Sequence, residues 1–138
     1  NYLLIDEITY RFREPLRGEV IVFRYPGNER TFFIKRIIGL PGERVESAAG
    51  AIAIFNGETK ERIAENYIVP QGGARDFDDV ILGSDEYFVL GDNRSYSFDS
   101  RDWGPVKREE IVGIVRLRIY PFQQFGVMGT SFYAPQMP

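Results

Sequence analysis

A single lysine, Lys35, stands within an apolar stretch that runs from Phe32 to a Leu-Pro-Gly turn at residues 40–42. The stretch is typical of a β-strand, in which side chains alternate between faces, so Lys35 lies between Phe33 and Ile37 on one face. Removing a lysine ammonium from water is costly. Either the side chain extends along the apolar surface to solvent, or it is desolvated and acts as a general base with a depressed pKa. Taken alone, the stretch favours the first interpretation.

A second stretch, residues 91–106, is too polar for a core strand and carries a serine close to charged side chains. One interpretation is a hairpin loop with an ordinary surface ion pair between Asp99 and Arg101. A calcium-binding loop is excluded, because Arg94 stands where an EF-hand needs an oxygen ligand and the closing glutamate is absent. If the segment is extended, Ser97 shares a face with Asp99 and Arg101. Its hydroxyl can then form a hydrogen bond with a neutral lysine amine.

The composition limits the chemistry that these residues can perform. The 138 residues contain no histidine and no cysteine, which excludes Ser-His-Asp and Cys-His catalysis, histidine-ligated metal centres and disulfides. Acid–base catalysis near neutral pH therefore needs a carboxylate or a lysine with a shifted pKa. The net charge of −3 comes without a basic cluster, so we expect no nucleic-acid partner. We also expect no metal and no cofactor, and no apolar run reaches the length of a membrane span.

Short strands must position both polar stretches, because the chain is rich in Phe and Tyr and alternates apolar with polar residues. We predict a hairpin of Val20–Tyr25 with Thr31–Ile38, turned at Pro26-Gly27-Asn28. Further strands are predicted at Tyr2–Ile5, Ile8–Phe12, Glu86–Leu90 and Ile111–Tyr120. No helix of convincing length is expected. The predicted class is all-β.

A middle segment interrupts this β-body. Ala51–Phe55, followed by Asn56-Gly57, is typical of a hairpin, and glycine-rich and acidic runs come after it. We therefore predict a main β-body at residues 1–47 and 84–121, an inserted β-subdomain at 48–83, and a C-terminal tail at 122–138.

The two polar stretches, in their order along the chain, resemble motifs of the type I signal peptidases. Residues 33–43 (FIKRIIGLPGE) are similar to the lysine-bearing segment of that family. Residues 91–104 resemble its C-terminal motif through Gly-Asp-Asn-Arg at 91–94, Ser97, Asp-Ser-Arg at 99–101 and Gly104. Residues 17–19 (RGE), followed by the Val20–Tyr25 strand, look similar as well. The resemblance implies a signal-peptidase-like β-fold, which is similar to that of self-cleaving repressor domains.

The resemblance also implies a role for each matched residue. Lys35 would be the general base of a Ser/Lys dyad, and Ser97 would orient its amine. Two salt bridges would stiffen the site, Asp99–Arg101 and Asp92–Arg36. Burial that lowers a lysine pKa by two to three units costs roughly 3–4 kcal/mol and makes the amine a usable base.

The activity that the resemblance implies is that of a serine endopeptidase. Its substrates would be the signal peptides of secreted preproteins, cut after small residues at the first and third positions before the scissile bond. The enzyme would be anchored by a single pass, with its catalytic domain against the outer face of the cytoplasmic membrane. We also expect a groove of apolar strand edges that binds an extended peptide by β-addition.

The nucleophilic serine is not assigned by the matched motifs. In the family it belongs to a Ser-Met-x-Pro-like motif ahead of the strand matched by Tyr2–Ile5, so we expect it upstream of Asn1, together with the membrane anchor. Residues 129–135 (GTSFYAP) loosely resemble this motif, which makes Ser131 a second candidate. A flexible tail is the simpler interpretation of these residues.

Two other functions remain open on the sequence. A catalytically incomplete homologue could bind peptides or assist the assembly of surface proteins, although a binding module has no need of a buried lysine. A self-cleaving repressor domain uses a related Ser/Lys dyad, but the C-terminal motif and the middle segment favour a peptidase.

Overall fold

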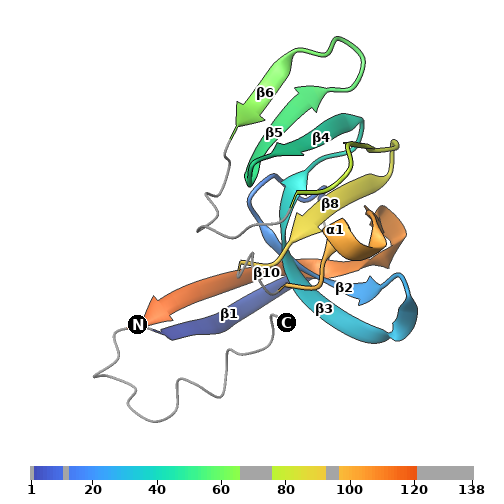
Figure 1. The fold of residues 1–138 in the computed structure, drawn as a ribbon. Coiled ribbons are helices and arrows are strands. Elements are labelled where there is room, and N and C mark those ends of the chain that lie inside the picture. Colours follow the sequence, from blue (N-terminus) through green and yellow to red (C-terminus); the bar gives the residue numbers. More distant parts are fainter. Residues whose placement is uncertain (1, 11–12, 66–75, 93–96, 121–138) are drawn as a thin grey trace.

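The computed structural model describes residues 2–10, 13–65, 76–92 and 97–120. Within these residues the chain is all-β, as predicted, and its strands form two antiparallel sheets. The larger sheet has six strands in the order β1-β10-β2-β3-β8-β9 (Figure 1). Their bounds are β1 Tyr2–Tyr10, β10 Ile111–Tyr120, β2 Val20–Tyr25, β3 Asn28–Gly39, β8 Glu86–Leu90 and β9 Val106–Lys107.

The predicted hairpin around the lysine is confirmed. Strand β2 pairs with β3 so that Ile21 lies opposite Lys35 and Phe23 opposite Phe33. The prediction of two separate strands at the start of the chain is wrong, because β1 is one strand paired with β10 throughout. A bulge between Ile5 and Glu7 takes up the polar interruption that the sequence analysis interpreted as a break.

The smaller sheet has four strands in the order β6-β5-β4-β7. They are β6 Arg62–Glu65, β5 Ala51–Asn56, β4 Glu43–Ala48 and β7 Val80–Ile81. The β4–β5 turn uses two residues with positive φ, Ala49 at 53° and Gly50 at 82°, and Asp76 accepts hydrogen bonds from both backbone N–H groups. Strand β4 begins at Glu43, directly after the turn that ends β3. The division of the chain at residues 48–83 stays a prediction.

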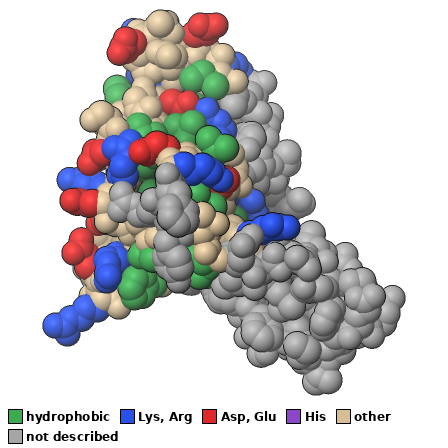
Figure 2. All heavy atoms as spheres, turned by 180° about the vertical axis from the view of Figure 1, so that it is seen from behind, with side chains coloured by type: hydrophobic (Ala, Val, Ile, Leu, Met, Phe, Trp, Pro, Cys, Tyr) green, Lys and Arg blue, Asp and Glu red, His purple; other side chains and the backbone are tan. Residues whose placement is uncertain are grey.

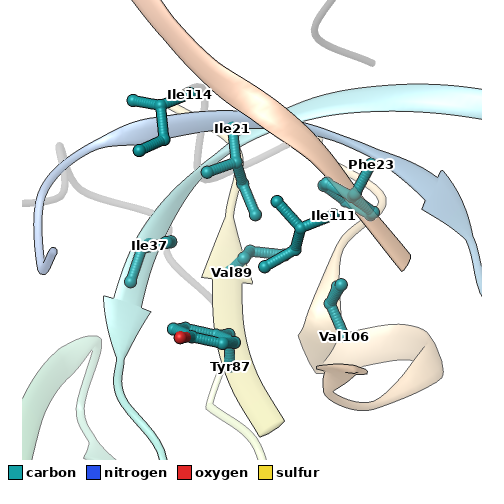
Figure 3. Close-up of a cluster of buried hydrophobic side chains, with 8 residues drawn as sticks. All are labelled: Ile21, Phe23, Ile37, Tyr87, Val89, Val106, Ile111 and Ile114. Carbon is teal, nitrogen blue, oxygen red and sulfur yellow. The ribbon is translucent and has the colours of Figure 1, made fainter. Parts of the chain in front are cut away.

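The described residues form two hydrophobic clusters, and the second of them joins the two sheets. One lies on β2, β3, β8, β9 and β10, and its members surround Val89 and Ile111 in Figure 3. The other joins Ile38, Phe88 and Leu90 of the larger sheet to Val45, Ile52, Ile54 and Leu82. Strands β3 and β8 therefore send alternate side chains into two different cores. Gly39 allows the close approach of the sheets, because a Cβ there would lie 2.8 Å from Val45 and 2.9 Å from Leu82.

The two helical segments of the described residues are short. Helix α1 spans Ser100–Trp103, and a 3-10 turn spans Arg108–Glu110. An extended conformation of residues 97–101 was only a condition in the sequence analysis. This condition does not hold beyond Asp99, because Asp99 caps α1. Its side chain accepts from the Arg101 N–H, and the Asp102 carboxylate accepts from the Asp99 N–H, which forms a capping box. Neither segment is long and apolar enough to cross a membrane.

On the face turned to the viewer in Figure 2, basic side chains are interspersed with acidic ones. The ion pairs on the surface include Arg13–Glu19, Arg108–Glu14, and Arg44 with both Glu46 and Asp79. Exposed pairs of this kind contribute little to stability. Among the described residues, no group of three or more acids, histidines or cysteines is placed to hold a metal ion.

Candidate active site

Lys35 lies on β3, a central strand of the larger sheet, and its side chain is buried. Only 1% of the residue is exposed, and its Nζ lies 3.2 Å from Ser97 Oγ. The ring centroid of Phe33, two residues earlier on the same strand face, is 5.5 Å from Nζ. The interpretation of Lys35 as a side chain that reaches solvent is therefore wrong. The alternation of β3 points the amine at the polar stretch 62 residues further along the chain.

Burial lowers the pKa of Lys35 from 10.5 to about 8. The nearby Asp99 carboxylate opposes this shift in pKa, while the Arg101 guanidinium adds to it. A lysine with a pKa near 8 is neutral in about a tenth of molecules at pH 7, against fewer than one in a thousand at its usual value. The site therefore supplies a free amine at neutral pH without a histidine.

The segment that carries Ser97 is fixed by its neighbours. Asp99 is fully buried, and its carboxylate accepts from the Gly91 N–H at 3.0 Å and from Arg101 Nε and Nη2 at 2.9 Å each. The Arg101 side chain is only 2% exposed. Ser100 Oγ accepts from the Val89 N–H at 2.9 Å. These bonds hold the segment against the end of β8, so the Ser97 hydroxyl has a defined position beside the amine.

Gly91 is a steric requirement of the site. A Cβ at this position would lie 1.9 Å from Ser97 Oγ, 2.5 Å from Ser97 Cβ and 3.4 Å from Lys35 Nζ. Any larger residue would displace the hydroxyl from the lysine. From the sequence alone this glycine is only one member of a motif, since a steric contact across a loop leaves no signal in residue spacing.

The second predicted salt bridge is present on the other face of β3. Arg36 Nε and Nη2 lie 2.9 Å from the two carboxylate oxygens of Asp92. Arg36 Nη1 also donates to the Gly18 carbonyl at 2.9 Å. This bidentate pair fixes the first residues of the polar stretch to the strand that carries the lysine.

A third ion pair was not predicted. Arg17 Nη1 and Nη2 each lie 2.7 Å from an oxygen of Glu43, and Arg17 also donates to the Ile38 carbonyl at 3.0 Å. Glu43 accepts the Leu40 N–H at 2.7 Å as well. The pair is largely buried, with side chains 16% and 11% exposed. It fixes the turn between β3 and β4. Both residues belong to stretches that the sequence analysis singled out, but nothing in their spacing of 26 residues indicated contact.

An aromatic cluster flanks the lysine. Tyr25 and Phe33 stack with ring centroids 4.8 Å apart, and Phe98 and Trp103 each lie within 6.3 Å of both rings. Phe23 supports the cluster from the core, at 5.9 Å from Trp103. The Trp103 indole N–H is buried and has no hydrogen-bond partner among the described residues. Phe33 connects this cluster to Lys35, since its ring centroid is 5.5 Å from Nζ.

The structure thus brings together Lys35, Ser97, Asp99 and Arg101, with Arg36 and Asp92 behind them. The other serine candidate, Ser131, lies outside the described residues. A desolvated lysine beside an oriented hydroxyl, in a site built without histidine, is typical of serine peptidases whose base is a lysine.

Comparison with known proteins agrees with this class. Residues 1–120 match the family model "Signal peptidase, peptidase S26". The chain belongs to this family. It is 40% identical over 131 residues to a probable signal peptidase I-2 of Synechocystis, covering 91% of this chain and 58% of that protein. It is 37% identical over 134 residues to a signal peptidase I of Leptolyngbya laminosa, covering 92% and 64%.

A solved structure gives the same result for the fold. The crystal structure of a signal peptidase I from Enterococcus faecalis superposes with a TM-score of 0.61 at 32% identity, covering 75% of this chain and 98% of that one. The chain spans about three fifths of the length of the two curated relatives described above.

Proposed function

We propose that this chain is the catalytic domain of an endopeptidase that removes signal peptides from preproteins, with Lys35 as the general base. The observation that carries the proposal is the buried amine of Lys35, 3.2 Å from Ser97 Oγ, with a pKa lowered to about 8 by burial. A module that only binds peptides would gain nothing from this lysine, whose desolvation costs about 3 kcal/mol.

The proposed reaction is acyl transfer to a serine. The neutral Lys35 amine removes the proton from a serine hydroxyl as the serine oxygen attacks the scissile carbonyl carbon. The resulting ammonium gives the proton to the leaving amine as the peptide C–N bond breaks. Water, deprotonated by the same amine, then hydrolyses the acyl-enzyme. Ser97 keeps the amine lone pair directed at the nucleophile.

The attacking serine lies, in this proposal, outside the described residues. The hydroxyl of Ser97 orients the lysine, that of Ser100 accepts the Val89 N–H, and that of Ser47 contacts the Phe77 backbone. The remaining described serine, Ser84, is exposed in the connection between β7 and β8. Ser131 and positions upstream of Asn1 are the candidates that the sequence provides or implies.

The substrate would bind as an additional strand. Strand β8 pairs with β3 from Arg36 onward, so in the described residues the edge of β3 before Lys35 has no partner on that side. An extended peptide added here would pass the amine, with alternate side chains directed at the site. We propose small residues at the first and third positions before the cut. We also propose that the domain works at the outer face of the membrane that its preproteins cross.

The test is cleavage of a signal-peptide substrate by the full-length protein and its variants. Lys35→Ala is expected to lower kcat/KM by about 10²–10⁴, the contribution of a general base, and Ser97→Ala to lower it as well. Lys107→Ala and Ser84→Ala, which change exposed residues away from the site, serve as matched controls. Cleavage by Lys35→Ala at the parent rate would refute the proposal.

A further inference from the structure

Phe98 is an exposed aromatic residue within a segment that is otherwise buried. It is 42% exposed, whereas Ser97 before it and Asp99 after it are 2% and 0% exposed. Its ring is not free to move, because it contacts three others, with centroid distances of 5.8 Å to Tyr25 and 6.3 Å to both Phe33 and Trp103. Phe98 therefore presents one rigid aromatic face to solvent.

The segment that follows Phe98 is also fixed, by two side-chain hydrogen bonds. The Asp99 carboxylate binds the Gly91 N–H, and Ser100 Oγ binds the Val89 N–H. A ring that is already ordered loses little conformational entropy when a ligand covers it. An exposed apolar surface of this kind is suited to binding a side chain.

The chemistry of the proposed reaction indicates which side chain would come near. The ammonium of Lys35 must pass its proton to the leaving amine, so that nitrogen has to come within about 3 Å of Nζ. The leaving amine belongs to the first residue after the scissile bond. The groups near Nζ include the Ser97 hydroxyl and the Phe33 ring. Phe98 follows Ser97 in the chain, and its ring centroid is 6.3 Å from that of Phe33.

We propose that Phe98, backed by Tyr25 and Phe33, is the contact surface for the side chain of the first residue after the scissile bond. This contact would make Phe98 a specificity-determining residue that favours substrates with a large apolar side chain at the first position after the scissile bond. The inference rests on the proposed function, because it uses the proton transfer from Lys35 to place the leaving amine.

The experiment compares two peptides that differ only in the first residue after the cleaved bond, leucine in one and alanine in the other. The full-length parent is expected to cleave the leucine peptide with a kcat/KM about tenfold higher. Phe98→Ala should bring the ratio of the two kcat/KM values close to one. Phe32→Ala is the matched control, because Phe32 is similarly exposed, at 50% against 42% for Phe98, but lies on the opposite face of β3 beside Arg24.

The ratio separates specificity from damage to the site. A change in Lys35 or in folding would lower both kcat/KM values together and leave their ratio as it was. A parent that does not discriminate between the peptides would overturn the inference. So would a ratio that survives Phe98→Ala, or one that Phe32→Ala removes equally well. A parent that cleaves neither peptide would refute the proposed function itself, which is a different result.

Discussion

Replacing Gly91 with alanine adds one methyl group at the point where the site has the least room. The new Cβ would lie 1.9 Å from Ser97 Oγ, whereas real Cβ contacts are essentially never under 3.0 Å. The hydroxyl must therefore move by about 1 Å or more, and its 3.2 Å hydrogen bond to Lys35 is lost. A misplacement of about 1 Å can cost about 10²-fold in rate. The φ angle at Gly91 is not in the left-handed region, so an alanine there adds no backbone strain. A lower rate would therefore report the steric clash alone.

The assay is peptide cleavage together with thermal unfolding. We expect Gly91→Ala to lower kcat/KM by about 10²-fold or more, while the variant still unfolds cooperatively. Gly83→Ala is the control, since its Cβ would meet only the flexible Glu86 carboxylate at 3.2 Å. In a Ser97→Gly background both clashing atoms of residue 97 are gone, so Gly91→Ala should then have almost no further effect. Parent-like cleavage by Gly91→Ala, or an equal loss in the Ser97→Gly background, would refute the steric argument.

Three further predictions concern the charges of the site. Because the base must be neutral, kcat/KM should rise with pH and level off above the Lys35 pKa of about 8; a flat profile between pH 6 and 9 would contradict this. Because the pKa of Lys35 is lower in the folded protein, the unfolded chain binds more protons than the folded one between about pH 8 and 10.5. Burying the charged lysine therefore destabilises the folded protein at pH 7. Lys35→Met should raise the free energy of unfolding at pH 7 by up to about 3 kcal/mol, while cleavage is lost. Denaturant titration at pH 7 and 10.5 checks this, and the gain should shrink at the higher pH. Asp99→Asn retains a capping side chain but leaves the buried Arg101 without its carboxylate. In the same titration this should lower the free energy of unfolding by about 3–5 kcal/mol. A decrease under about 1 kcal/mol would show that the ion pair is not effectively buried.

The sequence predicts the strands of the site well because their apolar pattern is local. The hairpin that carries Lys35 follows from alternation and a Pro-Gly-Asn turn, and the structure agrees with both. Helix α1 was not predicted, because a four-residue helix with three polar residues and one tryptophan has no apolar periodicity. Its only local signal is the Asp99–Asp102 capping box. The split of β1 was a related error, because a bulge preserves pairing where the local pattern breaks.

The contacts of the site are less accessible to sequence reasoning because they join distant parts of the chain. A strand pattern shows that Lys35 points to one face, but not that Ser97 meets it there. The resemblance to a family supplied that pairing. The Arg17–Glu43 ion pair and the lack of room for a side chain at Gly91 depend on how the loops pack in three dimensions. Residue types and spacing do not contain that information.

Strands β3 and β8 are buried on both faces, and this affects the dynamics of the molecule. Their side chains enter both hydrophobic clusters, so the backbone between Arg36 and Gly39 and its partner on β8 can be opened only by disrupting both cores. Amide hydrogens in this short ladder should exchange with solvent through near-global unfolding. The half of β3 before Lys35, where Asn28, Glu29 and Arg30 are exposed, should exchange through much smaller openings. The lysine thus stands at the boundary between the slowest-exchanging part of the sheet and the strand edge proposed above to bind the substrate.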